Sequence, residues 1–474
     1  MSDAWFKQLI SQFSAIKEHK IAFSLYDGNQ ITDITYPQFA ADVLAAAGYF
    51  VERGICDQHI ALLASGGYRW VVSFFSIIAT GNVAVPLNQA LPSDMLRWQC
   101  EKASVDLICY DDVENVEKLS CCSTVSLDQL CGNGAASIDH LCCKDNNSPI
   151  LMMFTSGTTG ISKLVVLSAE NLATSVDPPF LEVQHDCTPN RCLLSLPLYH
   201  IGSIREMLSR IYKNENLLIG RGAKYVFMDI PKLNPTHVGM VPAMAESFAK
   251  ILKRMNSANR ESIVGNCFKG ILAVGASMKP DVAEFLLKKG IEITVKYGMT
   301  ESAGHGSWGI LDENHIGSIG KPDKNMTFDI KAGEILLRSN AVMQGYYNDP
   351  EETDKVIVDG WLHTGDMGYC DKNGYYYITG RKKNVIILAN GENVNPEEIE
   401  TAFGACASIE ECLVYSDGKG ICADVFTKEQ EVVTAFINAY NSSVPMYRQV
   451  YKVNYTSEPL PKTGSGKIKR KENK

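Results

Sequence analysis

The segment "FTSGTTGISK", Phe154–Lys163, decides how the rest of the chain is interpreted. It contains three threonines, two serines and two glycines, and it ends on a lysine. Glycines let the backbone turn its N–H groups toward an anion, and short hydroxyl side chains supply further donors. A serine- and threonine-rich solvated turn is the alternative interpretation. The candidate phosphate ligands are Thr155, Ser156, Gly157, Thr158, Thr159, Gly160 and Lys163.

The sequences on either side of this loop predict strands. "PILMMF" precedes it and "KLVVLS" follows it, and a helix "AENLATSV" comes next, capped by Ser168. The loop therefore connects a strand to a strand. The phosphate loop of P-loop nucleotide triphosphatases needs Gly-x4-Gly-Lys-Ser/Thr leading into a helix, so this is a different kind of loop.

Both before and after the loop, stretches with helical periodicity alternate with short apolar runs. "TYPQFAADVLAAAGYFVERG" and "PAMAESFAKILKRM" predict helices, whereas the apolar runs predict strands; these are "HIALLA", "GNVAVPLN", "RCLLSLPL", "KYVFMDI", "GILAVGA" and "EITVKYG". This alternation is typical of parallel sheets with helices on their faces. After about residue 325, "FDIKAGEILLRS" and "GYCDKNGYYYITGR" predict antiparallel hairpins around Ala-Gly and Asn-Gly.

We therefore expect an α/β protein with a large N-terminal domain, residues 1–381, of parallel-sheet α/β layers plus a small β-barrel-like subdomain. A small, mobile C-terminal α+β domain, residues 382–474, should follow. The basic run Arg381-Lys382-Lys383 marks the junction between the two domains. At 474 residues the chain is long enough for two or three domains.

Composition limits the functional classes. The net charge of −9 argues against nucleic acid as the main partner. The fifteen cysteines are odd in number, scattered and without a Cys-x-x-Cys pair, which favours reduced thiols over disulfides or a zinc site. The apolar segment beginning at Trp70 is interrupted by Gly81-Asn82, so it predicts a buried helix and a strand instead of a membrane span. We expect a cytoplasmic monomer or homodimer.

Four further segments follow the loop in a fixed order. They are "KYGMTESAG" from Lys296, "GWLHTGDMGY" from Gly360, "YYYITGRKKNVIILANGENVNPEEIE" from Tyr375 and "PLPKTGSGKIKR" from Pro459. With the loop, these segments resemble the AMP-binding motifs of the adenylate-forming superfamily, which includes acyl- and aryl-CoA synthetases, luciferases and the adenylation domains of peptide synthetases. The resemblance covers the chain from about residue 35 to its end. Five motifs in order leave the solvated-turn interpretation of the loop with little support.

The resemblance implies an ATP-dependent ligase that converts a carboxylic acid to an acyl-adenylate, releases pyrophosphate and passes the acyl group to the thiol of coenzyme A. It implies that Tyr297 faces adenine beside Gly275, Ala276 and Ser277. Asp366 would accept from the ribose hydroxyls, and Arg381 would reach the ribose from the domain junction. Asp366 as an ordinary turn residue is the alternative for that position.

For the reacting groups, the resemblance implies that Thr300 donates to the α-phosphate and that Glu301 holds Mg²⁺. Lys467 would bridge the carboxylate and the α-phosphate, and Lys383 would be the hinge about which the small domain rotates between the two half-reactions. Glu301 as a helix-start acid and Lys467 as a solvated tail charge are the alternatives. Two positions depart from the usual pattern: Ile161-Ser162 replaces Lys/Arg-Pro, and Leu164 replaces glycine.

The acid and the thiol are less well defined by the sequence. "LPLYHIGSI" resembles a segment that lines the acyl pocket of acyl- and aryl-CoA ligases, where His200 would control access of the carboxylate. Tyr199-His200 stands where amino-acid-activating domains carry Phe-Asp, so an α-amino acid would lack its counter-ion. An aryl or medium aliphatic acid is expected. Coenzyme A is the expected acceptor, an acyl carrier protein is the alternative, and a nucleotide-binding pseudo-enzyme is a third interpretation. The expected pocket residues are Tyr199, His200, Gly202, Val274, Gly298, Met299 and Gly304.

Overall fold

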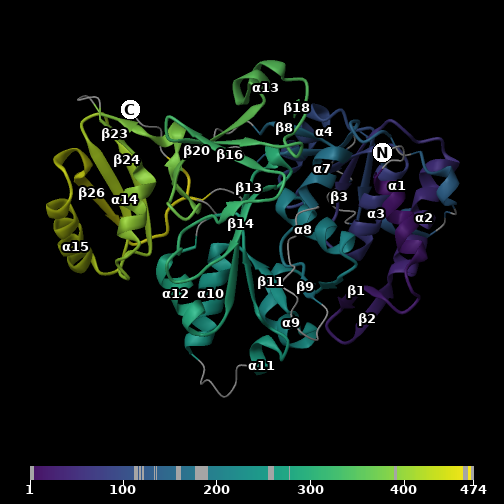
Figure 1. The fold of residues 1–474 in the computed structure, drawn as a ribbon, viewed down its shortest axis with the longest axis horizontal. Coiled ribbons are helices and arrows are strands. Elements are labelled where there is room, and N and C mark those ends of the chain that lie inside the picture. The colour runs from purple at the N-terminus through teal and green to yellow at the C-terminus, as the bar shows by residue number, and fades with distance from the viewer. Residues whose placement is uncertain are drawn as a thin grey trace.

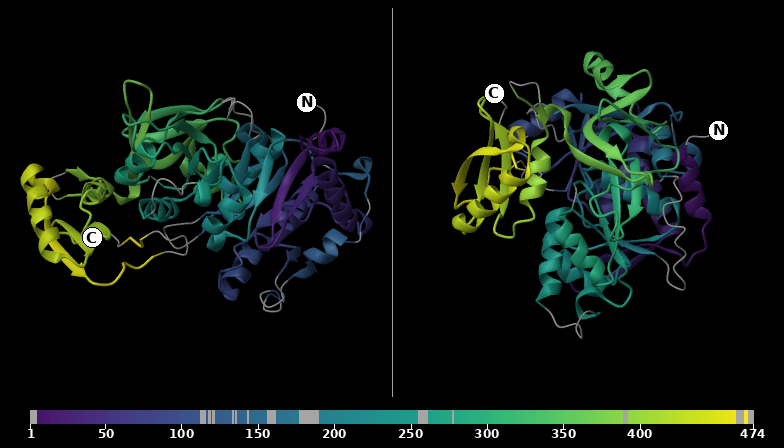
Figure 2. Two further views of the ribbon diagram at one scale, coloured as in Figure 1. Left: turned by 90° about the horizontal axis from the view of Figure 1, so that it is seen from below. Right: turned by 60° about the vertical axis from the view of Figure 1, so that its left-hand side comes forward.

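The structure is a computed structural model that describes residues 5–111, 116, 119, 122–132, 134, 136–142, 144–155, 162–176, 190–254, 261–276, 278–388, 392–462 and 468–470. Two large sheets with helices on their faces form most of the molecule, and a smaller antiparallel sheet lies beside them (Figure 1). The C-terminal unit, coloured yellow, lies at one end of the molecule in every view (Figures 1 and 2). The expected fold class, α/β with a large N-terminal part and a small C-terminal α+β part, is confirmed.

The first large sheet has seven strands, of which the central ones are parallel. Their order is β18 (Gly345–Tyr346), β8 (Leu164–Ser168), β7 (Pro149–Phe154), β4 (Val83–Pro86), β3 (His59–Leu63), β5 (Leu107–Tyr110) and β6 (Ser123–Ser126). β7 and β8 are antiparallel neighbours, with Phe154 opposite Leu164. The "FTSGTTGISK" loop therefore does connect a strand to a strand, as predicted.

The second large sheet has nine strands and is also mostly parallel. Their order is β15 (Lys321–Pro322), β14 (Gly306–Ile310), β13 (Glu292–Gly298), β12 (Gly270–Ala273), β11 (His237–Met240), β9 (Arg191–Leu193), β10 (Asn216–Ile219), β1 (Ile21–Tyr26) and β2 (Ile31–Thr35). β12 and β13 run parallel, so their carboxyl ends lie side by side at one edge of the sheet. In open α/β sheets, ligands bind beyond such ends.

Fourteen named α-helices lie in the described part of the chain. They are α1 (Trp5–Ala15), α2 (Tyr36–Glu52), α3 (Tyr68–Ala79), α4 (Ser93–Lys102), α6 (Leu127–Gly132), α7 (Ala169–Val176), α8 (Ile201–Tyr212), α9 (Val226–Leu233), α10 (Pro242–Lys253), α11 (Glu261–Val264), α12 (Pro280–Lys288), α13 (Pro350–Val356), α14 (Pro396–Phe403) and α15 (Gln430–Ser443).

One apolar core cluster joins both large sheets. It includes Phe39 of α2, Phe75 of α3 and Leu208 of α8, together with Leu62 of the first sheet and Leu217 of the second. Helix α2 begins as its sequence predicts, because Thr35 and Gln38 form a reciprocal capping box at its first turn. α3 is buried from Trp70 to Ala79. Among the described residues, none of the helices has both the length and the hydropathy of a membrane-spanning segment.

One predicted strand is wrong. "KYVFMDI", residues 224–230, forms the end of a short 3-10 turn and the start of helix α9. In α9 the apolar residues Val226, Ile230 and Leu233 are buried and recur every three or four positions, a helical spacing that extends beyond residue 230. The quoted run of seven residues is too short to show this helical period, so it was compatible with a buried strand.

The predicted hairpins are present. β16 (Thr327–Lys331) and β17 (Glu334–Arg338) are joined through Ala332-Gly333, and β20 (Trp361–Cys370) and β21 (Tyr376–Arg381) are joined through Asn373-Gly374. With β19 (Ile357–Val358) they form a five-stranded antiparallel sheet, which is the predicted subdomain.

In its described residues, the C-terminal unit contains two small sheets and the α-helices α14 and α15. The sheets consist of β22 (Ile386–Ile387) and β23 (Asn393–Val394), and of β24 (Glu411–Ser416), β25 (Ile421–Phe426) and β26 (Val450–Thr456). The side-chain amide of Asn395, before α14, donates to Thr379 of β21 over 3.3 Å. This contact joins the C-terminal unit to the antiparallel sheet.

Candidate active site

The segment "KYGMTESAG" forms the end of β13 and a tight turn after it. Gly298 is required here, because a Cβ at this position would lie 2.4 Å from the carbonyl oxygen of Gly304. Gly304 has φ +71°, a left-handed conformation that favours glycine. A 3-10 helix, Thr300–Ser302, begins directly after the strand. The fold therefore holds Thr300 and Glu301 beyond the carboxyl end of β13, at the edge where ligand binding is expected.

Tyr297, Asp366 and Arg381 lie together at this edge, as the sequence predicts. The Tyr297 hydroxyl donates to Asp366 Oδ2 over 2.7 Å, and Arg381 Nε lies 2.8 Å from Asp366 Oδ1. Asp366 and Arg381 are cross-strand partners on β20 and β21. Burial, followed by the negative charge of Asp366, raises the pKa of Tyr297 well above its usual value, so its hydroxyl stays protonated and donating. The cluster orients a nearly buried carboxylate beside an aromatic ring.

Glu301 is buried and accepts a hydrogen bond of 2.9 Å from the hydroxyl of Tyr346. Lys163 lies on the other side of Tyr346, its Nζ 4.7 Å from the ring centroid and 2.6 Å from a carboxylate oxygen of Glu352. Burial raises the pKa of Glu301, although Tyr346 and Lys163 act in the opposite direction. Tyr346 thus connects the predicted phosphate lysine to the predicted metal ligand. Tyr346 and Glu352 could not be predicted from the sequence, because each is far along the chain from its partner.

The two ends of the phosphate loop are held together. The Thr155 N–H donates to the Lys163 carbonyl over 2.9 Å, and the Lys163 N–H donates to Thr155 Oγ1 over 3.2 Å. Ser162 Oγ also donates to the Thr155 carbonyl. Leu164, which replaces the usual glycine, is 1% exposed in the core of the first sheet, so this departure serves packing. Ser156, Gly157, Thr158, Thr159, Gly160 and Ile161 lie outside the described residues.

The remaining predicted nucleotide contacts come from the turn after β12. Gly275 has φ +85°, and Gly275 and Ala276 are both exposed. Because β12 and β13 are parallel neighbours, this turn lies at the same edge as Tyr297. Ser277 and Lys467 lie outside the described residues.

Of the predicted acid-binding residues, Tyr199, His200 and Gly202 lie at the start of helix α8. His200 is the exposed residue that precedes α8, and its ring centroid lies 4.5 Å from that of Tyr199. Gly202, in the first turn, is exposed, and a Cβ there would meet nothing within 4 Å. Gly304 packs toward the same helix, since a Cβ at Gly304 would lie 3.6 Å from Ile201 Cγ1. Val274 and Met299 are half-buried at the ends of β12 and β13.

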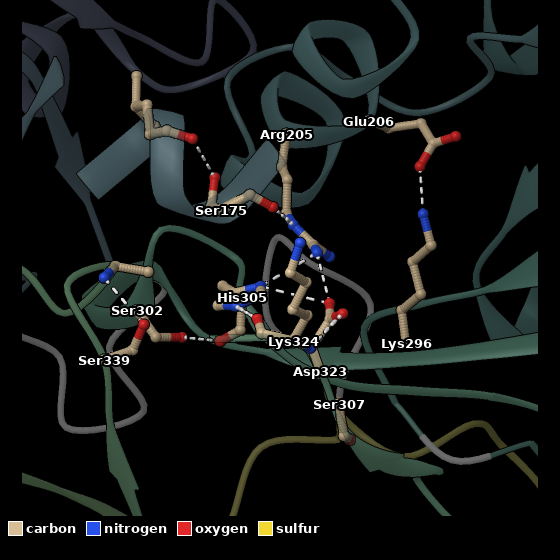
Figure 3. A network of polar contacts seen from close by, with 12 residues as sticks. Ser175, Arg205, Glu206, Lys296, Ser302, His305, Ser307, Asp323, Lys324 and Ser339 are labelled. Carbon is tan, nitrogen blue, oxygen red and sulfur yellow. Dashed lines mark hydrogen bonds and ion pairs between the residues drawn. The ribbon is translucent and has the colours of Figure 1, made fainter. Parts of the chain in front are cut away.

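A buried network that sequence reasoning missed holds the turn after Glu301 in place (Figure 3). Arg205 of α8 donates from Nε to the Ser175 carbonyl of α7 over 2.8 Å and from Nη2 to Asp323 Oδ2 over 2.8 Å. His305 Nδ1 lies 3.3 Å from the same Asp323 oxygen. Burial alone would raise the pKa of Asp323, but His305 and Arg205 hold it below its usual value. The network connects α7 and α8 to the turn after Glu301.

A second set of charges surrounds the predicted hinge. Glu334 of β17 lies 2.8 Å from Lys382 Nζ and 3.0 Å from His363 Nδ1, and it accepts a 3.0 Å hydrogen bond from the Gly365 N–H. Lys383, the predicted hinge, is exposed in a 3-10 turn. Burial lowers the pKa of Lys383, and the charges of Arg381 and Lys163 add to that effect. Glu334 thus binds the residue immediately before the predicted hinge.

These features define an α/β protein in which Tyr297, Asp366, Arg381 and Glu301 lie close together at the carboxyl end of β13. The family model described as "AMP-binding enzyme" matches residues 12–347, and that of the "AMP-binding enzyme C-terminal domain" matches residues 383–474. The chain belongs to the AMP-binding enzyme family, as the resemblance of its motifs predicted.

Several proteins similar to this chain bear the names of ligases. The chain is 25% identical to the long-chain-fatty-acid–CoA ligase FadD15 of Mycobacterium bovis, over 84% of this chain and 78% of that protein. It is 28% identical to the 2-succinylbenzoate–CoA ligase of Bacillus cereus, over 89% and 88%. The solved O-succinylbenzoate coenzyme A synthetase of Bacillus subtilis, in complex with AMP, has a TM-score of 0.84 at 22% identity, over 98% of this chain and 97% of that one. At that identity the structural likeness shows the fold alone.

Proposed function

We propose that the protein is an ATP-dependent acyl- or aryl-CoA ligase. It activates a carboxylic acid as an acyl-adenylate and transfers the acyl group to the thiol of coenzyme A. The observation that carries this proposal is the position of the Tyr297–Asp366–Arg381 cluster beside the buried Glu301, at the carboxyl edge of β12 and β13. Relatives from this family bear the names of CoA ligases, and one neighbouring structure contains ATP and a magnesium ion.

In the first half-reaction a carboxylate oxygen bonds to the α-phosphorus of ATP, and the bond from that phosphorus to pyrophosphate breaks. Negative charge develops on the phosphates, so the protein must supply cations and oriented donors. We assign ribose binding to Asp366 and Arg381, the adenine face to Tyr297, and donation to the α-phosphate to Thr300. Lys467 supplies the ammonium that bridges the carboxylate and the α-phosphate.

We assign the β- and γ-phosphates to the loop Thr155–Lys163. In the structure Lys163 is held by Glu352, so its ammonium must exchange that carboxylate for phosphate oxygens when ATP binds. An ammonium about 4 Å from a phosphate is worth roughly 4 kcal/mol at an effective dielectric near 20. The exchange is favourable only where the loop excludes water.

The donor set fits Mg²⁺. Magnesium is commonly held by one or two carboxylates plus substrate phosphates, and Glu301 is a buried carboxylate at this edge. Among the described residues no cluster of three or more acidic, histidine or cysteine side chains forms a complete protein cage for a metal, in keeping with a shared site of this kind. Mg²⁺ bound to Glu301 would neutralise charge on the triphosphate.

In the second half-reaction the thiol sulfur bonds to the acyl carbon, the bond from that carbon to the AMP oxygen breaks, and the thiol proton is released. We propose a domain division at residues 381/382 and rotation of the small domain about Lys383 between the two half-reactions. The rotation removes Lys467 and presents the segment after the hinge to the thiol. A single lysine on a separate domain makes such a division of labour possible.

An acyl carrier protein is the alternative acceptor, because a ligase that loads such a carrier needs the same adenylation site. The deciding experiment is ATP–pyrophosphate exchange across a panel of carboxylic acids, followed by mass detection of the thioester with coenzyme A or a pantetheinylated carrier. Acid-dependent exchange and a coenzyme A thioester are expected. Exchange with thioester on the carrier alone would favour the alternative, and nucleotide binding with no exchange for any acid would indicate a pseudo-enzyme.

A further inference from the structure

Helix α8 and strand β13 share a mostly buried charged pair beyond the predicted acid-binding residues. Glu206 forms an ion pair with Lys296 of β13, and its other oxygen accepts from Arg210 Nε over 2.7 Å. The side chains of Lys296 and Glu206 are 10% and 13% exposed. Figure 3 shows them extending toward each other from the helix and the strand. The mechanism proposed above uses neither of them.

Both members of the pair are charged near neutral pH. Burial alone would raise the pKa of Glu206, but Arg210 and Lys296 hold it well below its usual range. Burial lowers the pKa of Lys296 to about 8, which leaves the ammonium mostly protonated. Arg210 also forms an ion pair with Glu215, with its Nη1 2.7 Å from Glu215 Oε2. This second contact fixes the position of Arg210 and so helps to orient the carboxylate of Glu206.

The pair lies on the acid-binding side of β13. Successive side chains of a strand point to opposite faces, so Tyr297 faces the nucleotide cluster while Lys296 and Gly298 share the other face. On that face the Lys296 side chain contacts Glu206 of α8. Gly304 lies against Gly298 and is also close to Ile201 at the start of the same helix. An acid with its carboxylate near His200 therefore extends along α8 toward Glu206.

The positions of these residues along the two elements set the length of acid that would fit between His200 and the charged pair. Six residues separate His200 from Glu206, which is a rise of about 9 Å along an α-helix. Two residues separate Gly298 from Lys296, about 6.6 Å along a strand. An extended chain advances roughly 1.2 Å per bond, judged from the three backbone bonds of a residue. About five to eight bonds thus separate the carboxylate from the charged pair, enough for a short alkyl chain or one aromatic ring.

We propose that the Glu206–Lys296 ion pair closes the acid-binding space and makes the enzyme selective for short-chain or single-ring carboxylic acids over long-chain fatty acids. A longer alkyl chain would have to separate two buried charges, each of which would lose its partner in an apolar surrounding, and that separation is strongly unfavourable. This inference rests on the proposed function and names its substrate class. Lys296 and Glu206 act here as specificity-determining residues.

The test measures kcat/KM for coenzyme A thioester formation with butanoate, hexanoate, octanoate, dodecanoate, hexadecanoate and benzoate. We expect activity with the shorter acids and with benzoate, and a loss of about 10²-fold or more from octanoate to dodecanoate, of the size by which pockets discriminate on length. A kcat/KM for hexadecanoate that equals or exceeds that for octanoate would overturn the inference while leaving the ligase function intact. Absence of exchange with every acid would overturn the proposed function itself.

A double variant, Lys296→Ala with Glu206→Gln, tests the residues directly. It removes both charges together, leaves no buried charge of the pair behind and keeps an acceptor for Arg210. We expect the ratio of kcat/KM for dodecanoate to kcat/KM for hexanoate to rise by at least about ten-fold. A change of this size is within the range by which one methylene group alters kcat/KM in an apolar pocket. The matched control is Lys288→Ala with Glu284→Gln, an exposed Lys–Glu pair on α12 with the nitrogen and oxygen 3.7 Å apart, which should leave the profile unchanged. An unaltered length profile in a folded double variant would contradict the assignment.

Discussion

Replacement of Asp366 by asparagine tests the nucleotide site most directly. In the structure the two carboxylate oxygens of Asp366 are held by Tyr297 and Arg381 at 2.7 and 2.8 Å. Asparagine keeps the shape of the side chain but removes its charge and turns one acceptor into a donor. A hydrogen bond to a charged group contributes about 1.5–3 kcal/mol. Loss of one charge-assisted bond to the ribose should therefore lower kcat/KM for ATP by about ten- to 150-fold.

The assay compares ATP with 2′-deoxy-ATP in pyrophosphate exchange. In the wild type, removal of the ribose hydroxyl should lower kcat/KM by a similar factor, because the carboxylate loses its donor. In Asp366→Asn, kcat/KM for 2′-deoxy-ATP should be almost equal to kcat/KM for ATP. The two changes remove the same interaction, so their effects are not additive.

An equal loss for both nucleotides would refute the reasoning, since the carboxylate would then act only by holding Arg381 or the fold. Asp329→Asn is the matched control, because Asp329 is an exposed carboxylate on β16 of the same antiparallel sheet and should leave both nucleotides unaffected. Unfolding midpoints of both variants separate loss of binding from loss of the fold.

Four further changes test other parts of the site. Lys467→Ala should abolish acyl-adenylate formation, measured by pyrophosphate exchange, while supplied acyl-adenylate is still converted to thioester; unchanged exchange would contradict its role. Lys383→Pro should leave exchange largely intact and stop thioester formation, because proline fixes φ at the proposed hinge; equal loss of both half-reactions would exclude a hinge there. Glu301→Gln should raise the Mg²⁺ concentration for half-maximal exchange by about ten-fold or more, as loss of metal-site groups does, and an unaltered Mg²⁺ titration would remove Glu301 from the metal site. Burial alone would raise the pKa of Glu334, but hydrogen bonds from Lys382 and from a histidine hold it below its usual value. Its stabilising effect is therefore present above about pH 4.3 and is lost as the pH falls through the lower folded pKa. Wild type should exceed Glu334→Gln in free energy of unfolding by about 1 kcal/mol at neutral pH, and denaturant titrations should show this difference vanish in acid; a difference that persists there would contradict the pairing.

Local patterns predicted those features that depend on neighbours in the sequence. The hairpins at Ala332-Gly333 and Asn373-Gly374 follow from turn chemistry that acts over a few residues. Helix α7 occupies the predicted residues, and Ser168 accepts from the Asn171 N–H at its start, as a capping residue should. Where the local pattern was short, as in residues 224–230, a strand and a buried helix gave the same apolar run and the prediction was wrong.

Two of the predicted nucleotide residues lie together because they are on adjoining strands. Asp366 and Arg381 face each other across the hairpin β20–β21, so their pairing follows once the turn is known. The partners of Glu301 and Lys163 could not be predicted in this way, because neither lies on a hairpin with its partner. Tyr346 meets Glu301 across 45 positions, and no spacing in the chain connects them.

The sequence by itself determined the alternation of strands and helices, the hairpins and the order of the nucleotide motifs, because each depends on contacts within a few residues or on short stretches of fixed chemistry. Only the tertiary structure decided which distant charges are buried together, such as Arg205 with Asp323 and Glu206 with Lys296. A buried charge is stable only beside a partner at hydrogen-bond distance. That partner is supplied by the packing of one element against another, which the local sequence does not specify.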